Sequence, residues 1–163
     1  AVLNCPDIAA HPRVTCLIAG TNDLAKDMQI RVTSERHVRR DGMLYALSKM
    51  VTAARAYNIG VLDGVFNDIA DLDGLGQECE HGTALGFDGK TLIHPNQIAT
   101  ANRLFAPTFE EVNEAENIIA AFEDPENAGK GVLKVNGKMT ELLHLEQAKR
   151  VVAIASAIQE MET

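Results

Sequence analysis

Oxygen-bearing side chains gather directly after three short apolar runs of the sequence, at residues 14–19, 60–66 and 90–93. The first run is uncharged and rich in β-branched residues, which is typical of a buried parallel strand, and the other two are short strands of the same alternating pattern of elements. In folds of this kind the reactive residues lie on loops at the carboxyl ends of the strands, and these loops face one side of the sheet. The polar residues that follow the three runs are Asn22, Asp23, Asn67, Asp68, Asp71, His94 and Asn96.

The chemistry that such residues favour is the binding of a hard cation. Two or more acids on one face provide oxygen ligands, and Mg²⁺ suits this donor set best. The sequence has no cluster of histidine and cysteine with the spacing of a zinc site, and no G-x-S-x-G element of a serine hydrolase. We therefore expect a magnesium site at the strand ends rather than a zinc site or a serine nucleophile.

Each candidate residue also has a purely structural interpretation. Asp23 can cap a helix that begins just after it, and its spacing alone does not choose between a cap and a metal ligand. Asp68 and Asp71 are better explained as turn and cap residues. His94, which precedes a proline, is more typical of a structural histidine than of a base. Glu141 fits a favourable acid in the first turn of the last helix better than a catalytic acid.

The elements that must position these residues alternate between strands and helices. Apolar residues recur every three to four positions and predict helices at 43–57, 72–85, 95–104, 109–122 and 141–161. Gly86 is expected to end the second of them. A polar surface loop is expected at 29–41, a polar hinge at 124–131, and a hairpin at 132–139 with a type I′ turn at Asn136-Gly137.

This alternation predicts an α/β fold with parallel strands. Three βα units are too few to close a barrel, which leaves a small open sheet or the C-terminal part of a (β/α)8 barrel. No glycine-rich phosphate loop follows the first strand, which disfavours a dinucleotide-binding unit.

Composition excludes several classes of protein. The 163 residues suit one ordinary domain, and a formal charge of −8 argues against a nucleic-acid partner. No run approaches a membrane span, and residues 1–4 do not resemble a signal peptide. Cys5, Cys16 and Cys79 lack CxxC spacing, which predicts free thiols in a reducing cytoplasm. The first residue is not methionine, so we expect a processed or cut chain.

Three segments of the chain closely resemble one enzyme family. They are "GTNDLAKD", the stretch 60–123 that contains "GFDGKTLIHPNQI", and "GKGVLKVNGKMTELLHLEQAKRV". The chain resembles, from about residue 9 to residue 158, the citrate lyase β-subunit-like family of CoA-ester lyases in the HpcH/HpaI aldolase superfamily. The resemblance implies a (β/α)8 barrel with a C-terminal hairpin-helix lid that reaches a neighbouring subunit in a trimer or hexamer. Residues 1–123 would then be the last βα units of the barrel, and residues 124–163 the lid.

The same resemblance implies roles for particular residues. Asp23 of the "DL" motif would bind Mg²⁺, and Asn22 would contact the substrate carboxylate. The backbone of Ile93 and His94 would lie along the CoA thioester arm. Glu141 would be the catalytic acid of the lid, where the family usually has aspartate in a G-x-M-x-D stretch. Basic residues that could meet the CoA phosphates are Lys90, Lys130 and Lys138.

The activity implied is that of a Mg²⁺-dependent lyase that reversibly cleaves a 3-hydroxyacyl-CoA of the malyl, citramalyl or citryl type to an acyl-CoA and an oxo acid. Glutamate in place of aspartate at position 141 keeps open a second activity, malyl-CoA thioester hydrolysis. A third alternative is a catalytically incomplete fragment or an assembly subunit, because the family's metal-binding glutamate and substrate-binding arginine would both precede Ala1.

Overall fold

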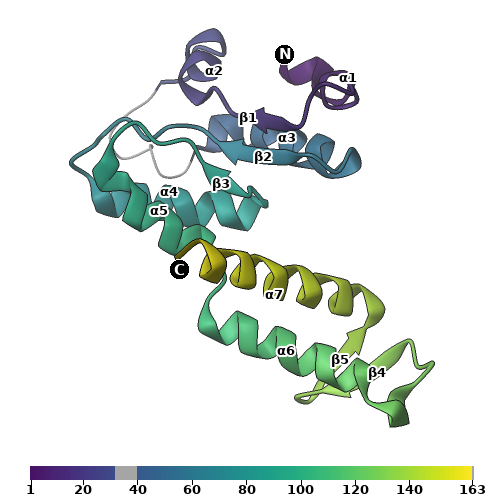
Figure 1. Ribbon diagram of the computed structural model, residues 1–163. Coiled ribbons are helices and arrows are strands. Elements are labelled where there is room, and N and C mark those ends of the chain that lie inside the picture. The colour runs from purple at the N-terminus through teal and green to yellow at the C-terminus, as the bar shows by residue number, and fades with distance from the viewer. Residues whose placement is uncertain (32–39, 163) are drawn as a thin grey trace. The chain divides into compact units, whose positions relative to one another are not determined.

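The computed structural model describes residues 1–31 and 40–162 (Figure 1), so most of the loop predicted at 29–41 lies outside the described residues. The chain forms two compact units, Ala1–Phe105 and Ala106–Thr163. The first contains, in order, η1 (Val2–Asn4), α1 (Cys5–Ala9), β1 (Cys16–Ile18), α2 (Thr21–Asp27), η3 (Asp41–Met43), α3 (Leu44–Ala56), β2 (Gly60–Asp63), α4 (Leu72–Leu85), β3 (Gly89–Lys90), η4 (Pro95–Gln97) and α5 (Ile98–Phe105).

The strands of the first unit pair in parallel in the order β1-β2-β3, which confirms the predicted α/β class. Leu17 pairs with Val61, and Asp63 pairs with Lys90 at the end of the sheet. The strands are shorter than predicted because each apolar run continues past the last ladder bond into a loop. All three loops leave the sheet at the same edge, as expected for parallel strands.

The core of the first unit forms where helices cover this sheet. Leu17 and Val61 belong to a buried cluster with Leu47 and Ala54 of α3, and Phe87 completes it before β3. α4 and α5 pack against each other beside β3 (Figure 1). They enclose a second buried cluster of Phe66, Leu75, Cys79 and Ala101. Phe66 belongs to the loop that follows β2, so the packing of its ring in this second cluster anchors that loop.

The second unit consists of α6 (Phe109–Glu123), η5 (Pro125–Asn127), β4 (Val132–Val135), β5 (Lys138–Glu141) and α7 (Leu142–Glu162). The predicted hairpin is confirmed: β4 and β5 pair antiparallel, and Asn136 and Gly137 both have the positive φ of a type I′ turn. α6 packs along α7 and against β4, and the two compact units divide after Phe105. The division into barrel units 1–123 and a lid 124–163, which the resemblance implies, stays a prediction.

Two further predictions can be compared with the described residues. Cys5, Cys16 and Cys79 are free thiols, as expected. None of the helices within residues 1–31 and 40–162 combines enough length with enough apolar side chains to span a bilayer.

Candidate functional site

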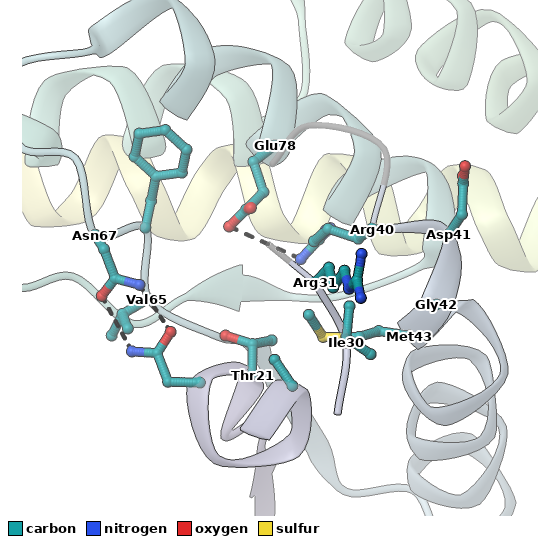
Figure 2. Close-up of a pocket in the computed structure, with 13 residues that line it drawn as sticks. Thr21, Ile30, Arg31, Arg40, Asp41, Gly42, Met43, Val65, Asn67 and Glu78 are labelled. Atoms are coloured by element: carbon teal, nitrogen blue, oxygen red, sulfur yellow. Dashed lines mark hydrogen bonds and ion pairs between the residues drawn. The ribbon is translucent and has the colours of Figure 1, made fainter. Parts of the chain in front are cut away.

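A pocket of about 260 Å³ lies at the edge of the sheet where β1 and β2 end (Figure 2). The first turn of α2, which follows β1, contributes Thr21 and Asn22, and the loop after β2 contributes Val65, Phe66 and Asn67. The remaining wall is formed by Ala25, Ile30, Arg31, Arg40, Asp41, Gly42, Met43 and Glu78. The pocket therefore occupies the position at which parallel α/β folds bind their ligands.

Two side-chain amides hydrogen-bond to each other and join the first turn of α2 to the loop after β2. Asn22 Nδ2 donates to Asn67 Oδ1 at 3.0 Å, and Asn67 Nδ2 donates to Asn22 Oδ1 at 2.7 Å (Figure 2). Each amide retains a second N–H and a second lone pair after this exchange. Both residues are exposed and line the pocket, so the pair can present donors and acceptors to a hydroxyl or carboxylate group.

Below the amides, the loop after β2 lies very close to the start of α2. A Cβ atom on Gly64 would lie 2.7 Å from the Ala19 carbonyl oxygen and would also meet the side chain of Thr21. Glycine is therefore required at position 64 for the loop after β2 to approach the start of α2. This close approach brings Asn67 within reach of Asn22.

The floor of the pocket is a buried ionic cluster that the sequence analysis did not anticipate. Both carboxylate oxygens of Asp63 accept from Arg40 Nη1 at 2.7 Å, and Asp63 Oδ1 also accepts from the Gly64 N–H at 2.8 Å. Lys90 Nζ donates to Glu78 and to the Gly64 carbonyl, and lies 3.6 Å from Asp63 Oδ2. The side chains of Asp63 and Lys90 are fully buried, so these opposite charges offset each other out of contact with water.

Arg40 is the residue that closes this cluster against the pocket. Its backbone adopts the left-handed conformation with φ of 44°, which is unusual for a residue with a long side chain. Its guanidinium is buried, and its Nε atom has no hydrogen-bond partner within residues 1–31 and 40–162. The prediction of a polar surface loop is therefore wrong at this position, because the two acids behind the pocket draw Arg40 inward.

Two titratable groups on α4 face the cluster. His81 Nδ1 lies 2.9 Å from Arg40 Nη2, and burial together with the Arg40 charge lowers the pKa of His81. Burial raises the pKa of the Cys79 thiol. Both shifts favour the uncharged forms of His81 and Cys79. The net charge of the cluster is therefore set by its two carboxylates, its guanidinium and its ammonium.

Asp23, the predicted metal ligand, is exposed within the first turn of α2. Gly20 occupies the N-cap position and no side chain caps this end, so the alternative interpretation of Asp23 as the N-cap is wrong. The helix begins earlier than the spacing indicated. Among the described residues, no group of three or more His, Cys, Asp or Glu side chains could hold a metal ion. The assignment of Asp23 as a metal ligand stays a prediction.

The acids of the loop after β2 are structural, as the sequence favoured. Asp71 caps α4 and accepts from the Gly74 N–H at 2.8 Å. Asp68 accepts from the Ala70 and Asp71 N–H groups and fixes the preceding turn. Gly86 ends α4 with φ of 95°, as predicted.

The loop after β3 carries the two predicted CoA contacts. His94 is the N-cap of η4 and accepts from the Asn96 N–H at 3.2 Å, which agrees with the structural interpretation of this histidine. The Ile93 N–H donates to Gln97 Oε1 at 3.1 Å. Neither Ile93 nor His94 is among the residues that line the pocket.

The proposed contacts between lysines and CoA phosphates need one correction. Lys90 is fully buried with its ammonium between Glu78 and Gly64, so it cannot reach a phosphate outside the cluster. Lys130 donates to Asn127 Oδ1 at 2.8 Å. Lys138 is exposed and pairs with Glu114 at 2.9 Å, and this hydrogen bond raises the pKa of the Lys138 ammonium. Lys130 and Lys138 both belong to the second unit.

Glu141 is the last residue of β5 and lies before α7. The first turn of α7 contains no acid, so the interpretation of Glu141 as a first-turn residue is wrong. Its main-chain N–H donates to His144 Nδ1 at 2.9 Å, which leaves the carboxylate out of that bond. The catalytic role of Glu141 stays a prediction.

Comparison with known proteins adds independent information. The chain matches the family model described as HpcH/HpaI aldolase/citrate lyase over residues 1–95. It is 47% identical over 157 residues to a (3S)-malyl-CoA thioesterase of Cereibacter sphaeroides, and this match covers 96% of the chain and 54% of the relative. It is 37% identical over the same length to the citrate lyase subunit beta of Leuconostoc mesenteroides subsp. cremoris, covering 96% of the chain and 51% of the relative.

Among solved structures, the fold resembles the CitE protein of Mycobacterium tuberculosis in complex with magnesium, acetoacetate and coenzyme A. The TM-score is 0.72 at 27% identity, and the match covers 93% of this chain and 57% of that one. The chain thus spans about half the length of the curated relatives that it matches.

Proposed function

This chain belongs to the HpcH/HpaI aldolase/citrate lyase family, and on that premise we propose that the whole protein hydrolyses the CoA thioester of a small 3-hydroxy acid, with (3S)-malyl-CoA as the first candidate. The observation that carries the substrate class is the pocket of about 260 Å³ with paired amides at the ends of β1 and β2. This volume suits a small acid group rather than a whole CoA ester.

Hydrolysis takes precedence over carbon–carbon cleavage because of the relatives. Over the same 157 residues, identity is 47% with the malyl-CoA thioesterase and 37% with the citrate lyase subunit. In hydrolysis, water adds to the thioester carbonyl and the CoA sulfur leaves and takes up a proton, which yields malate and free CoA. The family resemblance alone favours cleavage, and the longer acid at position 141 keeps hydrolysis open.

Carbon–carbon cleavage is the second candidate and uses the same substrate. The bond between the hydroxyl-bearing carbon and the α-carbon of the thioester breaks, the hydroxyl loses its proton, and the α-carbon takes one up. The products are glyoxylate and acetyl-CoA, with no free thiol. The citrate lyase relative favours this reaction.

The residues of this chain have separate proposed tasks. Asn22 and Asn67 would donate hydrogen bonds to the acid group of the substrate, because both amides line the pocket. The backbone of Ile93 and His94 would lie along the thioester arm. Glu141 would move a proton between water or substrate and solvent.

A magnesium ion fits the described residues only in part. Asp23 is exposed at the strand-end face and has no partner among the described residues, so its carboxylate is available to a cation. Mg²⁺ is commonly held by one or two protein carboxylates, with water and substrate oxygens completing its shell. When bound, the ion would polarise a substrate carbonyl. The remaining protein ligand would come from outside the described residues of this chain.

The product assay separates the two reactions. The full-length protein is incubated with (3S)-malyl-CoA, and free thiol and glyoxylate are measured in parallel. Hydrolysis predicts one thiol per substrate consumed and no glyoxylate, whereas cleavage predicts glyoxylate with acetyl-CoA and no thiol. Turnover of neither kind would refute the proposed substrate.

The metal assignment has its own matched pair of variants. Asp23 and Asp27 are both exposed acids of α2. Asp23→Ala should abolish magnesium-dependent turnover, and Asp27→Ala should leave it intact. Equal activity of the two variants would contradict the role of Asp23.

A further inference from the structure

Gln97 is a fully buried polar side chain that does not line the pocket. It is the last residue of η4, directly after the loop that leaves β3. Its Oε1 accepts from the Ile93 N–H at 3.1 Å, and its Nε2 donates to the Phe66 carbonyl at 3.0 Å. One side chain thus bonds the main chain of two different strand-end loops.

The Phe66 end of this link is part of the pocket wall. Phe66 lines the pocket, and its neighbour Asn67 is the residue that pairs with Asn22. The Phe66 side chain is held separately, because it is buried with Leu75 in the second apolar cluster. Gln97 is therefore the side chain that fixes the main chain at this point, while apolar packing fixes the ring.

A second amide of the same segment offers a natural control. Asn96 Nδ2 donates to the Ile69 carbonyl at 2.7 Å, further along the loop after β2. Asn96 is exposed, whereas Gln97 is completely enclosed. Water can replace the Asn96 bond after substitution, but it cannot readily replace the two bonds of Gln97.

We propose that Gln97 is a positioning residue of the substrate pocket, because it links the Ile93–His94 segment to the pocket wall at Phe66–Asn67. The link keeps the two loops at a fixed distance, so that the acid group and the thioester arm of one substrate can bind to them together. This rests on the proposed function. Gln97 itself touches no substrate, since it lies outside the pocket lining.

The first measurement does not depend on activity. In the full-length protein, Gln97→Met preserves the length of the side chain and removes both hydrogen bonds. Hydrogen exchange at the Ile93 amide should accelerate at least tenfold, and exchange in the peptide that contains residues 64–71 should also rise. Asn96→Ala should leave the Ile93 amide protected. Unchanged exchange at Ile93 in Gln97→Met would overturn the link.

The second measurement, of kcat/KM, tests whether Gln97 positions the loops that bind the substrate. At a temperature where each variant is folded, Gln97→Met should lower kcat/KM for (3S)-malyl-CoA at least tenfold, mostly through KM. Faster exchange in Gln97→Met with an unchanged kcat/KM would show a merely structural role and overturn the proposal.

Gln97→Glu serves if Gln97→Met does not fold. The glutamate can accept from the Ile93 N–H at all pH values, but it can donate to the Phe66 carbonyl only when protonated. Its kcat/KM relative to wild type should rise as pH falls, and a flat ratio would contradict the proposal. If wild-type protein turns over malyl-CoA by neither reaction, the proposed function fails, and exchange at Ile93 still decides whether Gln97 links the loops.

Discussion

Replacing Lys90 with methionine should destabilise the folded protein by about 3–5 kcal/mol, the range typical of removing one partner from a buried ion pair. The four charged groups of the cluster, Arg40, Lys90, Asp63 and Glu78, sum to zero in the wild type. After Lys90→Met the sum is −1. Methionine has nearly the same length and shape as the lysine stem, so the change removes charge and hydrogen bonds and leaves little cavity.

The magnitude follows from what the substitution leaves behind. Glu78 loses its bond to Lys90 and, among the described residues, retains Arg40 at 3.9 Å as its cationic partner. The Gly64 carbonyl loses the donor that Lys90 supplies. Neither group is in a position to regain full hydration, since Lys90 is fully buried and the Glu78 side chain is only 7% exposed. Two orphaned groups at about 1–3 kcal/mol each account for the expected range.

The assay is urea unfolding of the full-length protein, with Lys138→Met as the matched control. Lys138 forms one exposed pair with Glu114, the two side chains being 73% and 50% exposed. Such exposed pairs contribute little to stability, because water and salt screen them. With a slope of about 2 kcal/mol per molar, Lys90→Met should lower the midpoint by about 2 M and Lys138→Met by less than about 0.5 M.

Two results would refute this reasoning. Equal midpoints for Lys90→Met and Lys138→Met would mean that burial does not strengthen the lysine interactions. A second test is the double variant Glu78→Gln with Lys90→Met, which removes the orphaned carboxylate as well. It should recover part of the lost stability. A loss in the double variant that equals the sum of the two single losses would show that Glu78 and Lys90 are not coupled.

Three further predictions concern stability. Gly64→Ala should destabilise by about 1–3 kcal/mol through overpacking against Ala19, whereas Gly131→Ala, where an added Cβ meets nothing within 4 Å, should leave the melting temperature nearly unchanged. Asp71→Ala should lower the unfolding free energy by about 1 kcal/mol in urea titrations, because it removes the N-cap of α4, and a neutral result would contradict the capping role. The pKa of His81 is lowered by folding, so its stabilising contribution is present above about pH 6.5 and is lost as pH falls through the folded-state pKa. The urea midpoint should therefore fall as the pH is lowered below about 6.5, and His81→Gln should reduce that fall; an unaltered pH dependence would exclude His81 as its source.

Elements with local signals were predictable from the sequence. Helix α4 has the predicted bounds because Asp71 caps its start and Gly86 takes the left-handed conformation at its end. The β4–β5 hairpin follows from Asn136-Gly137, since two successive residues with positive φ specify the turn. The alternation of strands and helices was enough for the α/β class and the parallel pairing.

The ionic cluster was not predictable, because its partners are distant in sequence. Arg40 and Asp63 are 23 positions apart, and Glu78 and Lys90 are 12 apart. A charged residue at the end of an apolar run indicates only that an oppositely charged side chain lies near it in the fold. The identity of the partner depends on strand register and on where α4 packs, and neither can be obtained from spacing.

The ionic cluster has a consequence for the site that an apolar core would not have. Each of its strand residues also bonds main chain at the point where the chain leaves the sheet: Asp63 accepts from the Gly64 N–H, and Lys90 donates to the Gly64 carbonyl. Apolar side chains of similar volume could match the stability of the ion pairs but could not orient a peptide group. Because Gly64 is the position at which the loop after β2 approaches the start of α2, fixing its peptide groups also fixes the approach of Asn67 to Asn22. The charges buried beneath the pocket therefore determine the geometry of the amides at its surface.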